Sequence, residues 1–109
     1  QELADRIAGS DMVRGITIAA GGFFGPQGRE LRIPLADPHQ NEKIENFKYG
    51  ELQICNFEME SSALAGLARL MGHRATTVCM VIANRLIKEA NTGYKNSIDT
   101  LIETVLERI

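Results

Sequence analysis

Apolar side chains recur at three- and four-residue spacing in three stretches of the chain, as they do along one face of an α-helix. These stretches are residues 1–8, 61–71 and 98–109. Gly72 directly follows the second stretch and is its expected C-cap, because glycine readily adopts the left-handed conformation found there. The pattern therefore predicts three amphipathic helices.

A fourth helix is predicted to begin at residue 37 and to end at Gly50. Asp37 can cap its N-terminus, Pro38 suits the first turn, and Gln40 stands at the spacing of a capping box. Its apolar positions are few, so we expect this helix to lie on the surface.

Three further stretches are rich in β-branched and apolar residues and predict strands: residues 12–20, 52–57 and 75–83. Strands and helices thus alternate, which indicates an α/β fold of helix–sheet–helix layers with a mostly parallel or mixed sheet. We expect the three strands to share one sheet. Three strands cannot shield two apolar faces and two edges, so we expect further strands from elsewhere in the protein or from another subunit.

Composition narrows the class of protein. The 109 residues are 44% hydrophobic and 24% charged, with a formal net charge of −2. This balance speaks against a basic nucleic-acid-binding arm and against a disordered acidic tail. No stretch approaches the roughly 18 consecutive apolar residues of a membrane span. Because the chain opens inside a predicted helix and without methionine, we expect a fragment of a longer protein or a trimmed chain.

The cysteines give no sign of a metal site. Cys55 and Cys79 lie too far apart for a Cys-x-x-Cys pair and fall in apolar stretches. We expect two buried, reduced thiols in a cytoplasmic protein. The chain also lacks a phosphate-binding P-loop and a Gly-x-Ser-x-Gly motif.

One candidate site lies at the junction between the second predicted strand and the helix that follows. Glu58, Met59 and Glu60 stand where a helix N-terminus leaves backbone N–H groups free. A carboxylate can accept hydrogen bonds from two adjacent hydroxyls, which suits a ribose 2′,3′-diol. The alternative is that both glutamates only complement the helix dipole, and the spacing alone favours this alternative.

A second candidate is the glycine-rich loop after the first strand, residues 21–29. Gln27 offers a donor and an acceptor on one amide, and Arg29 offers a fork of donors. Phe23 can stack on a planar base, so the three residues suit the edge and face of a pyrimidine. An ordinary Gly/Pro loop with one solvated arginine is the alternative.

Arg85, with Asn84, directly follows the third predicted strand. Helix capping and a surface charge are the alternative, and these two residues by themselves favour that alternative. Ligands of α/β proteins bind beyond the carboxyl ends of parallel strands. We therefore expect Gln27, Arg29, Glu60 and Arg85 to converge on one cleft.

Three motifs together resemble the uridine phosphorylases, the uridine branch of the nucleoside phosphorylase superfamily. They are Phe23-Phe24-Gly25-Pro26-Gln27-Gly28-Arg29, then Asn56-Phe57-Glu58-Met59-Glu60-Ser61-Ser62, then Val81-Ile82-Ala83-Asn84-Arg85, in this order and spacing. The resemblance implies that residues 1–109 are the C-terminal portion of a nucleoside phosphorylase domain.

The resemblance also implies roles for individual residues. Gln27 and Arg29 resemble the catalytic pair that holds the uracil carbonyls and ring N–H, with Phe23 packed on the base. Met59, through its backbone, and Glu60 resemble the ribose ligands, with Glu58 beside them, and Arg85 resembles a second arginine on the base side. Asn84 stands where the purine branch has an aspartate, which again favours a pyrimidine.

The activity implied is reversible phosphorolysis of uridine to uracil and ribose 1-phosphate, a glycosyl transfer in pyrimidine salvage. Phosphate is the co-substrate, and no metal or other cofactor, nucleic acid or membrane is expected. The resemblance implies a homo-oligomer, a dimer or a hexamer built of dimers, with the phosphate-binding residues outside this chain. The alternatives are a catalytically inactive fragment or half-site binding module, and a nucleosidase of the same superfamily.

Overall fold

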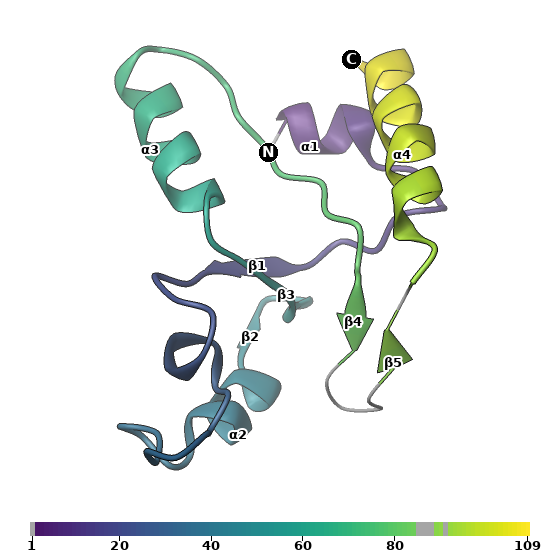
Figure 1. Ribbon diagram of the computed structural model, residues 1–109. Coiled ribbons are helices and arrows are strands. Elements are labelled where there is room, and N and C mark those ends of the chain that lie inside the picture. Colours follow the sequence, from purple (N-terminus) through teal and green to yellow (C-terminus); the bar gives the residue numbers. More distant parts are fainter. Residues whose placement is uncertain (1, 85–88, 91) are drawn as a thin grey trace. The chain divides into compact units, whose positions relative to one another are not determined.

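Residues 2–84, 89–90 and 92–109 are described by the computed structural model shown in Figure 1. The chain divides into two compact units. Met12–Ala75 forms one unit, and Gln1–Asp11 together with Thr76–Ile109 forms the other. Apart from Arg85, the residues predicted to bind the base and the ribose belong to the unit Met12–Ala75.

The unit Met12–Ala75 is built on a three-stranded mixed sheet with the order β1-β3-β2. Strand β1 (Ile16–Ala19) pairs in parallel with the central strand β3 (Leu52–Glu58), so that Ala19 lies opposite Glu58. Strand β2 (Lys48–Tyr49) pairs antiparallel with the other side of β3. The prediction that the first two strands share one sheet is confirmed, and so is the α/β class of the fold.

Helix α3 (Ser61–Leu70) follows β3 and confirms the predicted helix and its cap. Gly72 has a φ of 74°, its N–H donates to the Arg69 carbonyl at 3.2 Å, and the His73 N–H donates to the Ala68 carbonyl at 2.7 Å. These two bonds form a Schellman motif, which satisfies carbonyls that the end of the helix would otherwise leave unpaired.

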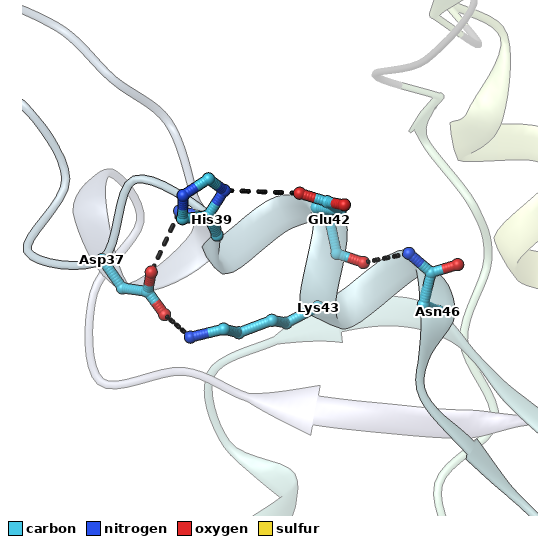
Figure 2. Close-up of polar contacts among 5 residues, drawn as sticks. All are labelled: Asp37, His39, Glu42, Lys43 and Asn46. Carbon is cyan, nitrogen blue, oxygen red and sulfur yellow. Dashed lines mark hydrogen bonds and ion pairs between the residues drawn. The ribbon is translucent and has the colours of Figure 1, made fainter.

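Helix α2 spans only Gln40–Asn46, so the prediction of a helix from residue 37 to Gly50 is wrong at both ends. The Asp37 carboxylate accepts the His39 N–H at 2.9 Å and the Lys43 ammonium at 2.6 Å, in a turn that precedes the helix (Figure 2). Gln40 forms no capping box, because its side chain bonds to the loop before it. After Phe47 the backbone is extended and enters β2, and Gly50 lies in the β2–β3 turn.

The third predicted strand is wrong over most of its length. Residues 75–82 carry no strand assignment, and only Ala83–Asn84 (β4) pairs, antiparallel, with Glu89–Ala90 (β5). An apolar run predicts burial but does not by itself supply the neighbouring strand that a ladder needs. The expectation that this run shares the sheet of β1 and β3 is therefore not met.

Two helices of the other unit confirm their predictions. These are α1 (Glu2–Ile7) and α4 (Tyr94–Arg108). Arg108 donates to the Ile7 carbonyl at 3.0 Å and to both carboxylate oxygens of Asp11 at 3.0 Å. These hydrogen bonds join the end of α4 to the end of α1, and the Arg108 guanidinium lowers the pKa of Asp11.

Few side chains are buried. Among the described residues, the buried apolar ones are Ile7 and Ala20. Neither Cys55 nor Cys79 forms a disulfide in the described part of the chain, but both are exposed, so the prediction of buried thiols is wrong. The apolar stretches that contain them have no covering layer within this part of the chain.

Candidate functional site

The loop that leaves β1 closes into a short 3₁₀ helix, η1 (Gly25–Gln27). The Phe24 carbonyl accepts the N–H groups of Gln27 and Arg29, both at 3.0 Å, and the Gly25 carbonyl accepts the Gly28 N–H at 2.8 Å. Gly28 has a φ of 72°, a conformation that side-chain-bearing residues rarely adopt. We call residues 24–29 the η1 turn.

Phe23, Gln27 and Arg29 lie together at this turn, and we call them the loop cluster. The Arg29 guanidinium lies 3.7 Å from the centroid of the Phe23 ring, within the range of a cation–π contact. It donates to the Gln27 Oε1 atom at 2.6 Å and also to the Phe23 carbonyl. Gln27 is only 4% exposed, whereas Phe23 is 52% exposed. The cluster thus combines a fixed amide, a guanidinium and an accessible aromatic ring.

Helix α2 contributes contacts to the η1 turn that the sequence analysis missed. The Gln40 amide nitrogen donates to the Pro26 carbonyl at 3.1 Å and to the Gly25 carbonyl at 3.4 Å. The Asn41 amide nitrogen donates to the Gly28 carbonyl at 2.9 Å. The sequence feature that could have indicated these contacts is a pair of neighbouring amide side chains at the start of a short helix after a glycine-rich loop.

Glu58 binds the start of α3. Its carboxylate accepts the N–H groups of Glu60 and Ser61 at 2.8 and 2.7 Å and also accepts the Ser61 hydroxyl. The Ser61 hydroxyl, followed by the backbone N–H groups, lowers the pKa of Glu58. The Glu58 carboxylate therefore satisfies N–H groups at the start of α3, and its assignment beside the ribose ligands stays a prediction.

Glu60 has a different environment. It is exposed, and its carboxylate accepts the Met59 N–H at 3.2 Å. Met59 is also exposed. The two residues hold a carboxylate at an accessible strand–helix junction, and a carboxylate can accept hydrogen bonds from the two hydroxyls of a diol.

The loop and the junction start at the same edge of the sheet. Because β1 and β3 are parallel, their carboxyl ends lie side by side, and the Ala20 N–H donates to the Glu58 carbonyl at 2.8 Å. Figure 1 shows the chain leaving β1 toward α2 and leaving β3 toward α3. The convergence of Gln27, Arg29 and Glu60 on one cleft stays a prediction, and Arg85 lies outside the described residues.

A pocket of about 870 Å³ lies between the η1 turn and the segment that follows it. Its lining is mostly apolar and comes from residues 24–26, 29, 31–36 and 40, with Arg29 as the member it shares with the loop cluster. Glu58, Met59 and Glu60 do not line it. A polar base and sugar need several converging hydrogen-bonding groups, and the lining of this pocket has few of them. We therefore place the candidate site at the loop cluster and the junction.

Within residues 2–84, 89–90 and 92–109, no group of three or more His, Cys, Asp or Glu side chains gathers in a way that could hold a metal ion. None of the helices in this part of the chain has the length and apolar character to cross a membrane.

The sequence matches the Phosphorylase superfamily over residues 1–108. Uridine phosphorylase A of Schistosoma mansoni is 40% identical over 76 residues, which cover 69% of this chain and 25% of that protein. Uridine phosphorylase of Thermococcus kodakarensis is 33% identical over 75 residues, which cover 69% of this chain and 26% of that protein. The chain thus spans about a quarter of the length of these relatives. No solved structure matches it significantly.

Proposed function

Because the chain belongs to the phosphorylase superfamily, we propose that its protein is a pyrimidine-nucleoside phosphorylase that acts on uridine. The reaction is the reversible phosphorolysis of uridine to uracil and ribose 1-phosphate, with phosphate as co-substrate and no other cofactor. The loop cluster carries this proposal, because Phe23, Gln27 and Arg29 gather at the end of a parallel strand. The names of the two relatives support the choice of uridine.

In this proposal, Gln27 and Arg29 bind the carbonyls and ring N–H of uracil. Negative charge develops on the base as the bond between C1′ and the ring nitrogen breaks, and fixed donors stabilise that charge. The Arg29 guanidinium covers one face of Phe23 at 3.7 Å. Stacking of the base on that face therefore requires the guanidinium to move from the ring to the edge of the base.

Glu60 and the Met59 backbone bind the ribose diol in the same proposal. Glu58 is already bound by two N–H groups and one hydroxyl of the α3 start, so its part is to fix the junction. Holding the sugar in one orientation lets phosphate approach C1′ without further loss of freedom. Arg85 is proposed as a second residue on the base side.

The phosphate-binding residues are proposed to lie outside these 109 residues. The chain spans about a quarter of the relatives, and a neighbouring subunit of a homo-oligomer, a dimer or a hexamer of dimers, would complete the site. We propose a cytoplasmic enzyme of pyrimidine salvage. Residues 1–109 are proposed as the C-terminal portion of its catalytic domain.

The test is uracil release from uridine by the longest polypeptide that the gene encodes, with and without phosphate. We expect uracil release that depends on phosphate, and no phosphorolysis of inosine. Thymidine and deoxyuridine serve as comparison substrates. Equal release without phosphate would indicate a nucleosidase. Binding of uracil without turnover under either condition would indicate a half-site binding module.

A further inference from the structure

We propose that Gln40 and Asn41 are positioning residues, which hold the η1 turn and thereby set the orientation of Gln27 and Arg29. This inference rests on the proposed function for its effect on catalysis. Its structural part concerns only the turn and α2. Neither residue is assigned to the base or to the sugar.

The hydrogen bonds from α2 reach the turn on both sides of Gln27. The Gln40 amide donates to the carbonyls of Gly25 and Pro26, and the Asn41 amide donates to the carbonyl of Gly28. The N–H groups of the turn are already bonded inward to Phe24 and Gly25. The bonds that the carbonyls of Gly25, Pro26 and Gly28 accept from α2 therefore tie the turn to a helix outside it.

The fit between Gly28 and Asn41 is close. A Cβ atom placed on Gly28 would lie 1.9 Å from the Asn41 Oδ1 atom and 2.8 Å from its Cγ atom. The Asn41 side chain thus occupies the space that a side chain at position 28 would need. A side chain at position 28 would displace the Asn41 amide from its 2.9 Å bond to the turn, and it would also be strained at a φ of 72°.

Helix α2 is itself held in place, so its side chains can hold the η1 turn in one position. It packs against β3. Its start is fixed by the His39 N–H and the Lys43 ammonium, which donate to the Asp37 carboxylate (Figure 2). Catalytic donors act only in a narrow range of positions, and a displacement of about 1 Å can cost on the order of 100-fold in rate.

Asn41→Asp is the sharpest variant, because it removes the amide donor and keeps the shape of the side chain. An acidic residue near the start of a helix favours the helix dipole, so α2 itself is not weakened. Asn46→Asp is the matched control on the same helix. Among the described contacts, the Asn46 amide donates to the Glu42 carbonyl within α2, at 2.8 Å. The charge that Asn46→Asp adds lies near the C-terminus of the helix, where the helix dipole disfavours it.

The first readout is amide hydrogen exchange at Gln27, Gly28 and Arg29. We expect exchange at these positions to become roughly three- to tenfold faster in Asn41→Asp and in Gln40→Glu, the size of change produced by the loss of one hydrogen bond. In Asn46→Asp, the exchange rates of the same three amides should stay within about twofold of the wild type. Equal exchange in Asn41→Asp and Asn46→Asp would overturn the proposal without any measurement of activity.

The second readout is the steady-state kinetics of the longest polypeptide that the gene encodes. In Asn41→Asp we expect kcat/KM for uridine, per mole of folded enzyme, to fall about tenfold, since one hydrogen bond is lost and the position of two base ligands is affected. KM for phosphate should stay within about twofold, because the base side alone is disturbed. Loss of folded enzyme would lower the apparent kcat in proportion to the folded fraction measured by circular dichroism. A fall in kcat no larger than the loss of folded enzyme would contradict a positioning role.

The two parts of the test separate the two hypotheses. A wild-type protein without phosphorolysis would contradict the proposed function, while the exchange measurement would still decide whether α2 holds the turn. Phosphorolysis with unchanged exchange and kinetics in both Asn41→Asp and Gln40→Glu would overturn the positioning role alone.

Discussion

Arg29 is the residue on which the proposed chemistry depends most. It contacts both other members of the loop cluster, through the Phe23 ring and the Gln27 Oε1 atom. In the full-length protein, Arg29→Ala should reduce kcat/KM for uridine by about 2–4 kcal/mol of transition-state stabilisation, the usual loss on removal of one such donor. The measurement is steady-state uracil release at saturating phosphate.

Arg32→Ala is the control for this prediction. Arg32 lines the apolar pocket beyond the turn, together with Arg29, but none of the described contacts of the loop cluster includes it. Its removal should change kcat/KM by less than about twofold, because an exposed charge outside the site contributes little. Similar losses in the two variants would remove the assignment of Arg29.

Glu58 and Glu60 are two residues apart and yet differ in what they bind. Glu58 accepts three donors from the start of α3, and these lower its pKa. A carboxyl whose pKa is lowered by folding contributes stability above its ordinary pKa and loses it as the pH falls through the lowered value. The contribution of Glu58 should therefore be complete at neutral pH and decline as the pH falls below about 4.5.

Glu58→Gln tests this pH dependence. The melting temperature of the variant should be lower than that of the wild type at pH 7, and the difference should shrink as the pH falls below about 4.5 toward the lowered pKa of Glu58. Glu60→Gln is the control, since Glu60 binds only the Met59 N–H in the described contacts. A difference for Glu58→Gln that stays constant from pH 7 to pH 3 would contradict the role of the ionised carboxylate.

The sequence predicted the candidate residues of the η1 turn and of the strand–helix junction better than it predicted their partners. The proximity of Phe23, Gln27 and Arg29 follows from their spacing on one short loop. The bonds from Gln40 and Asn41 depend on how a helix 13–15 residues away packs against the loop, which no local pattern specifies. Gln40 was expected to bond within its own helix, and it bonds to the loop instead.

At the scale of elements, helices with a clear apolar periodicity were predictable and the third strand was not. For α3, both the periodic face and the capping glycine are local features, and both are confirmed. A strand depends on a partner that is distant in sequence, which β3 finds in β1 and residues 75–82 do not find in the described chain. The short α2 ends early for a similar reason, because the segment after it pairs with β3.

The end of α3 offers a matched pair of glycine substitutions. Gly72 has a φ of 74°, so Gly72→Ala should destabilise the helix end by about 1 kcal/mol, the cost of a side chain in the left-handed region. Gly66 lies inside α3, and a Cβ there would meet nothing within 4 Å. Gly66→Ala should instead stabilise the helix by about 0.5–1 kcal/mol.

Urea unfolding followed by far-ultraviolet circular dichroism measures both effects. The two variants carry the same chemical change, so opposite signs would isolate the backbone conformation as the cause. Destabilisation of similar size in both would contradict the Schellman cap at Gly72.

At the scale of the whole chain, the exposed apolar surface is the dominant feature. Helix α3 leaves Leu64 and Leu67 each 58% exposed, and α4 leaves Ile102 and Leu106 exposed. An amphipathic helix in a folded enzyme buries such a face against other layers. The small number of predicted strands already indicated that these apolar faces lack a covering layer. The relatives are about four times as long as the matched region.

The isolated 109-residue chain should therefore self-associate, because exposed apolar faces of this size favour contact with one another. Sedimentation velocity should show a mass that rises with concentration. Adding a charge to the apolar face of α3 with Leu67→Lys should reduce the association. Ser62→Lys adds the same charge to the same helix at a polar, exposed position and should leave it unchanged.

The same chain should release no uracil from uridine, with or without phosphate, at any concentration. Attack on C1′ requires several donors converging on the phosphate oxygens. The residues with proposed roles in this chain serve only the base and the sugar. Association brings together copies of the same incomplete site and adds no missing group. Phosphate-dependent turnover by the purified chain would show that a phosphate site exists within these residues, and would require the active unit to be redefined.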